Sequence, residues 1–101
     1  MGTRASIIFR DRHDEYFVYR GHDGHPENII RDIEQSIETA KGRWSGSECG
    51  TFVTLFLSEH FDLKSRLPDY ELTTSVHGDE SYHYTVEWDG KGWMVSCLER
   101  E

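Results

Sequence analysis

Hydrophobic residues in this chain follow two different spacings. They alternate with polar residues in the first twenty positions and again after residue 69, whereas between positions 29 and 40 they recur three or four residues apart. A period of two is typical of a strand, and a period of 3.6 is typical of a helix that covers a core. The chain is therefore expected to fold as an α+β protein.

Strands are expected over residues 5–10, 15–20, 70–76, 82–88 and 93–97. The polar stretch 11–14 separates the first two strands and predicts a hairpin turn. Glycine-containing turns at 77–81 and 89–92 separate the last three, and an Asp-Gly pair such as Asp89-Gly90 favours a hairpin. The last three strands are expected to form an antiparallel meander.

Pro26 and Glu27 mark the start of a first helix, because proline suits the first helical position and an acid suits the first turn. The apolar stripe that follows lies within about 100° of arc, as a core-facing helix requires. Lys41-Gly42 is a typical helix end.

A second helix is expected to run to about Phe61, because Ser45 and Glu48 have capping-box spacing. Residues 51–57 are rich in β-branched and aromatic side chains, so a strand is the alternative there. The length of the segment favours the helix.

These elements predict one α+β domain over residues 1–101, in the order β-β-α-α-β-β-β. A single antiparallel sheet is expected, with two helices packed on one face and the other face open to water. A chain of 101 residues buries roughly two thirds of the surface that it exposes when unfolded, which suits one core.

Acidic residues dominate the second half of the chain. Between positions 69 and 89 there are six carboxylates and no Lys or Arg. The formal net charge is −8, and residues 51–101 contribute −6 of it, with ten acids against four bases. Such a field repels nucleic acid and membranes and favours a basic protein partner. The alternative is that the acids only keep a small protein in solution.

Two further features are candidates for contact with a partner. Glu34 and Glu38 form a like-charge pair on the outer face of the first helix, which does not favour helix stability. Trp44 lies in a polar connection, where an indole either anchors an interface or folds back on the core. The expected partner-binding residues are Asp69, Glu71, Asp79, Glu80, Glu87, Asp89, Glu34, Glu38 and Trp44.

No catalytic residue, metal site or cofactor is assigned. His22, Asp23 and His25 could supply metal ligands, but Asp23-Gly24 is also a typical tight turn before a helix. Cys49 has no local signature of a nucleophile. Cys97 alternates with Val95 and is expected to be a small core residue.

The first thirty residues lack the apolar stretch of a secretory leader, and no apolar run approaches the roughly 18 residues that span a bilayer. A soluble protein of the cytoplasm with reduced thiols is expected.

The start Met1-Gly2-Thr3-Arg4 and the segment Asp23-Gly24-His25-Pro26 resemble a family of small phage and prophage proteins. Members of that family usually have Tyr where this chain has His25. The resemblance covers the first thirty residues well and the later elements loosely, and the family has no assigned enzymatic activity.

A phage origin implies an anti-CRISPR or other anti-defence inhibitor. The function expected is non-enzymatic: the acidic surface binds a basic nucleic-acid site on a host complex, most naturally a CRISPR effector, with no direct contact to nucleic acid or membrane. The alternatives are a small metal-dependent hydrolase that uses His22, Asp23 and His25, and a phage structural or assembly factor. A monomer or a small homo-oligomer fits each of these.

Overall fold

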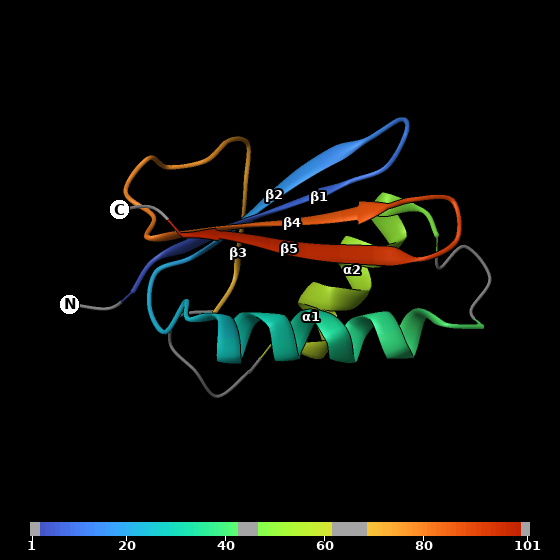
Figure 1. Cartoon of the computed structure of the whole chain (residues 1–101), viewed down its shortest axis with the longest axis horizontal. Coiled ribbons are helices and arrows are strands. Elements are labelled where there is room, and N and C mark those ends of the chain that lie inside the picture. The colour runs from blue at the N-terminus through green and yellow to red at the C-terminus, as the bar shows by residue number, and fades with distance from the viewer. Residues whose placement is uncertain (1–2, 43–46, 62–68, 100–101) are drawn as a thin grey trace.

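The computed structural model describes residues 3–42, 47–61 and 69–99. Its elements are β1 (Ala5–Arg10), β2 (Glu15–Arg20), α1 (Pro26–Ala40), α2 (Cys49–Glu59), β3 (Glu71–Thr73), β4 (Tyr82–Trp88) and β5 (Trp93–Glu99) (Figure 1). The α+β fold is confirmed. The second helix, expected from a capping box at Ser45 and Glu48 to about Phe61, is confirmed as α2, while the proposed cap at Ser45 lies outside the described residues.

The sheet has the strand order β3-β2-β1-β4-β5. Neighbouring strands are antiparallel except β1 and β4, which run in the same direction with Ile7 opposite Tyr84. The prediction of a purely antiparallel sheet is therefore wrong, and so is the three-strand meander. The reason is that a tight turn fixes the pairing of only the strands it joins, and residues 74–81 form a loop long enough to carry the chain from one edge to the centre.

Both helices cover the same face of the sheet, as expected (Figure 1). Phe9 of β1 packs against Phe52 and Phe56 of α2, with ring centroids 5.8 and 5.2 Å apart. Ile29 and Ile33 of α1 are also fully buried. The core therefore lies between the central strands and the two helices.

A buried polar cluster joins α1 to β2 and to the end of α2. The Tyr70 hydroxyl donates to Asp32 Oδ2 at 2.6 Å, and Arg20 Nη1 lies 3.5 Å from the same oxygen. The side chains of Arg20 and Asp32 are only 10% and 12% exposed. Because a charge withdrawn from water is costly unless it is paired, Asp32 and Arg20 depend on each other.

His60 completes this cluster from α2. Its Nδ1 lies 2.8 Å from the Phe56 carbonyl, which can only accept, so the ring carries a proton there. Its Nε2 lies 3.7 Å from Asp32 Oδ1 and has no hydrogen-bond partner among the described residues. The Asp32 carboxylate thus meets Arg20 of β2, Tyr70 just before β3 and His60 at the C-cap of α2.

We predict that Asp32→Ala lowers the free energy of unfolding by about 3–5 kcal/mol, because it leaves the Arg20 charge buried without its partner. Tyr70→Phe removes one hydrogen bond and is expected to cost about 1–2 kcal/mol. Urea unfolding followed by circular dichroism measures both. Glu34→Ala on the exposed face of α1 is the control, and equal stability of Asp32→Ala and Glu34→Ala would contradict the role of the cluster.

Candidate acidic binding site

The acids of residues 69–89 do not form one open row on the sheet. Asp79 lies 2.9 Å from Arg4 Nη1, and Glu87 lies 3.1 Å from Arg10 Nε. Asp69 lies 3.3 Å from His22 Nε2. These contacts are exposed, so each stabilises the fold little, but each places a cationic or basic side chain beside the carboxylate.

Glu80 is only 1% exposed, and its expected place on the acidic surface is wrong. Its carboxylate accepts hydrogen bonds from the Ser6 hydroxyl and from the backbone N–H groups of His77 and Gly78. Burial raises the pKa of Glu80, but these hydrogen bonds outweigh it and lower the pKa to about 2. Glu80 therefore fixes the β3–β4 loop against β1 and is not available to a partner.

The other expected residues vary in how freely they can meet a partner. Glu71 is exposed on β3. Asp89 is exposed and accepts hydrogen bonds from the backbone of Lys91 and Gly92, both at 2.8 Å, which lower its pKa. Its carboxylate is therefore ionised but also closes the β4–β5 turn.

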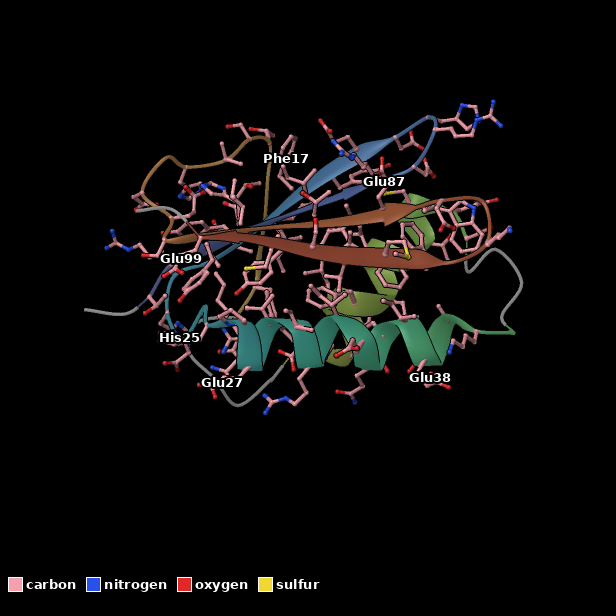
Figure 2. The ribbon with its side chains drawn as sticks, viewed as in Figure 1. Phe17, His25, Glu27, Glu38, Glu87 and Glu99 are labelled. Atoms are coloured by element: carbon pink, nitrogen blue, oxygen red, sulfur yellow. The ribbon has the colours of Figure 1, made fainter. Side chains whose placement is uncertain are left out.

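On α1, Glu34 is exposed and Glu38 lies 3.0 Å from Lys41 Nζ. Figure 2 shows Glu27 and Glu38 on the side of α1 that points away from the sheet. This outer face is open to a partner at least at Glu34. Trp44 lies outside the described residues.

The open face of the sheet has an apolar centre. Ile8 of β1 lies between Phe17 of β2 and Thr85 of β4, and Met94 and Leu98 are exposed on β5. The polar side chains expected there come from β3 and β4, but the sheet order places β1 and β2 between these strands. The acids of this face are thus separated by apolar side chains.

Acids from separate parts of the chain meet instead at the end of the sheet where the β1–β2 turn lies against α2. A cavity of about 940 Å³ opens there, lined by three carboxylates, three hydroxyls, His13 and the half-buried side chain of Leu55, and bordered by Phe52, which is fully buried. The carboxylates belong to Asp11, Asp14 and Glu48, and the hydroxyls to Thr51, Thr54 and Ser58. We call this cavity with its three carboxylates the acidic cavity.

Asp11 sets the geometry of the acidic cavity. Its Oδ1 accepts the backbone N–H groups of His13 and Asp14, both at 2.8 Å, and its Oδ2 accepts the N–H of Cys49 at 3.0 Å. Hydrogen bonds from Asp14 and His13 are the main causes that lower the pKa of Asp11. One side chain thus shapes the hairpin turn and caps α2, and it keeps a negative charge at neutral pH.

Sequence patterns indicated the 11–14 turn but not the acidic cavity. Asp11 and Cys49 are 38 positions apart, and no spacing rule relates a turn acid to a helix start at that separation. Glu48 was expected only as part of a capping box. The structure places it at the N-cap of α2 without a side-chain cap hydrogen bond.

The two cysteines differ from each other. Cys49 is fully buried, and burial, together with the nearby Asp11, raises the pKa of its thiol to about 12. It stays protonated and is a poor nucleophile. Cys97 is exposed, so its expected place in the core is wrong: β5 lies at the sheet edge, where alternation does not guarantee cover.

The loop residues His22, Asp23 and His25 are held by different contacts. His22 lies beside Asp69, His25 Nε2 lies 3.0 Å from Thr3 Oγ1, and Asp23 has a left-handed backbone with φ of 53°. Among the described residues no three His, Cys, Asp or Glu side chains gather as metal ligands would. The loop has the geometry of a turn that leads into α1.

Comparison with models of protein families, with curated proteins and with solved structures gave no match. Among residues 3–42, 47–61 and 69–99, neither helix has the length and apolar character needed to cross a bilayer.

We predict that Glu80→Gln lowers the free energy of unfolding by about 2–3 kcal/mol at neutral pH, because an amide accepts fewer of the hydrogen bonds that the buried carboxylate accepts. The folded-state pKa of about 2 lies below the ordinary value of 4.5. The stabilisation that the ionised Glu80 carboxylate provides is therefore complete above pH 4.5, and it is lost as the pH falls toward 2. Acid-dependent unfolding should be shallower in this range for Glu80→Gln than for the parent chain.

Glu71→Gln is the matched control, since Glu71 is exposed on the short strand β3. It should keep the pH dependence of the parent chain. If the two variants lose stability in parallel as the pH falls, the Glu80 carboxylate does not act as described.

Proposed function

We propose that this chain is a non-enzymatic binding protein that docks its acidic cavity onto a basic site of a partner protein. The observation that carries the proposal is the meeting of Asp11, Asp14 and Glu48 around one cavity in a chain of net charge −8. Arg12 belongs to the same turn but does not line the cavity, and His13 is the one basic residue among the described residues that do. A cationic side chain of a partner suits such a site.

The lining of the cavity suits the long side chains of Lys and Arg in particular. Their charged ends form strong hydrogen bonds with carboxylates, and their aliphatic stems pack on apolar surface. Asp14 and Glu48 are exposed and offer the charge, while the half-buried Leu55 offers apolar surface. Asp11 already accepts three backbone hydrogen bonds, so its role is to hold the site in shape.

The partner that we propose is a nucleic-acid-binding complex of a phage host, with a CRISPR effector as the first to test. The resemblance of residues 1–30 to small phage and prophage proteins and the net charge of −8 support it. Binding at a basic groove would exclude nucleic acid by occupying its site. Such an inhibitor acts in the host cytoplasm, and salt weakens it because charge attracts it to its target.

The remaining exposed acids can extend this contact. Glu71, Asp89 and Glu34 stay on the surface, and they add to the field that draws the chain toward a basic groove. They lie on different elements, so we assign them to long-range attraction and assign the specific contact to the acidic cavity.

Fluorescence anisotropy with a labelled deca-arginine peptide tests the site. The double variant Asp14→Lys with Glu48→Lys is expected to bind the peptide at least about tenfold more weakly, because it replaces two charge-assisted contacts with repulsion. The variant Glu27→Lys with Glu34→Lys changes the net charge equally on the outer face of α1 and controls for charge alone.

If both double variants lose the same affinity, only net charge matters and the acidic cavity is not the site. A DNA-binding competition assay with purified CRISPR effectors then tests the partner. Inhibition by the parent chain that weakens with salt and disappears in the cavity variant supports the proposal. Inhibition that the cavity variant retains would contradict it.

A further inference from the structure

The strand β5 forms an edge of the sheet, and its sequence lacks the usual protection against pairing with another strand. It runs for seven residues, WMVSCLE, with Glu99 at its end as the single charged side chain. Exposed edges normally carry lysine, proline or a bulge. At the opposite edge, β3 has only three residues. Within the described residues no strand pairs with the outer side of β5.

Along β5, the backbone N–H and C=O groups of successive residues point alternately toward β4 and away from the sheet. The N–H of Tyr82 in β4 points to Arg4, toward β1, and Tyr82 lies opposite Glu99. The alternation of an antiparallel ladder then directs the backbone groups of Met94, Ser96 and Leu98 toward β4. Those of Val95 and Cys97 point outward, where a further strand can bind them.

Apolar side chains that are exposed on one face of the sheet and half-buried on the other lie beside this edge. On the open face, Met94 is 60% exposed and Leu98 is 69% exposed. On the helix face, Ile30 and Ile37 of α1 are half-buried. Ser36, on one flank of α1, donates a hydrogen bond to Glu59 of α2. Ile30 and Ile37 lie on the other flank, so they face away from α2 and toward β5, which α1 also contacts.

We propose that two copies of the chain associate by antiparallel pairing of their β5 strands about a two-fold axis at Ser96. This register places Val95 opposite Cys97 of the second copy, where both backbones point outward to bond. It also places Met94 opposite Leu98 of the second copy. Met94 and Leu98 form a pair without backbone hydrogen bonds, and such pairs bring their side chains closest together. The two exposed apolar side chains therefore cover each other. The result is one continuous sheet of two copies.

Charge favours the antiparallel register. Glu99 is the single charged side chain of β5 and lies at its end. In the antiparallel pair each Glu99 lies opposite Trp93 of the other copy, whereas parallel pairing would bring the two Glu99 carboxylates together. The register that pairs the exposed apolar side chains is therefore also the one that keeps the two carboxylates apart, and a second copy fits this edge.

Disulfide trapping tests the register. In a chain with Cys97→Ser, the variant Ser96→Cys places two thiols at the two-fold axis, about 4.5 Å apart between Cα atoms and within disulfide reach. In the same background, Met94→Cys places the two thiol-bearing residues about 14 Å apart between Cα atoms. Position 94 lies opposite position 98 of the second copy, which is four strand residues away from that copy's position 94. On non-reducing gels, Ser96→Cys is expected to give at least about tenfold more cross-linked dimer than Met94→Cys.

Sedimentation equilibrium of the unmodified chain at about 100 μM should give a mass of twice 11.8 kDa. Leu98→Lys should give a monomer with an unchanged circular dichroism spectrum, because Leu98 is exposed within one copy.

Salt should strengthen association by screening the repulsion between two copies of charge −8, which is opposite to its effect on a basic partner. A monomeric mass for the unmodified chain, or equal cross-linking of the two thiol variants, would overturn the proposal.

Discussion

The parallel pairing of β1 with β4 determines how the rest of the molecule is arranged. Because these central strands run in the same direction, the turns that follow them, at 11–14 and 89–92, lie at the same end of the sheet. The start of α2 reaches this end too, since Cys49 N–H bonds to Asp11. If β1 and β4 ran in opposite directions, the turns that follow them would lie at opposite ends of the sheet. The cavity itself is lined by the β1–β2 turn, α2 and the last residue of α1, so the turn at 89–92 lies at the same end of the sheet without forming its wall.

The loop of residues 74–81 makes that direction possible. It leaves β3 at one edge and brings the chain to β4 beside β1. Glu80 holds it there through Ser6, and the His77 ring stacks on Tyr19 with centroids 3.7 Å apart. Asp79 adds contacts to Arg4 and to the Tyr19 hydroxyl. A carboxylate that composition alone would assign to the surface is thus a structural part of the crossing.

The sequence predicts the helices and strands of this fold better than it predicts which strands lie side by side in the sheet. Hydrophobic period and turn residues locate both hairpins and both helices, because these features depend on residues close in the chain. They do not report which strands meet across a loop, so the sheet order was not predictable. Cys97 shows the same limit: alternation assigned its face of the strand, but not whether anything covers that face.

Charge patterns have a similar limit at the candidate site. A run of acids predicts a negative field, yet Glu80 is buried and Glu87 lies beside Arg10 from a strand far away in sequence. Asp32 is likewise withdrawn from solvent, by Arg20 of β2 and by Tyr70, which precedes β3. Local patterns therefore indicate how much charge is present, and tertiary contacts decide how much remains for a partner.

The two proposed contacts use different parts of the molecule and do not compete. The acidic cavity lies at the end where β5 begins, and the two-fold axis lies at the middle of β5. Antiparallel pairing directs the two β5 starts in opposite directions, so the two cavities lie at opposite ends of the joined sheet. A pair of copies joined in this way would present two separated acidic sites on one sheet. Such an arrangement binds an extended basic groove more tightly than either site alone when the spacing of the basic groups matches.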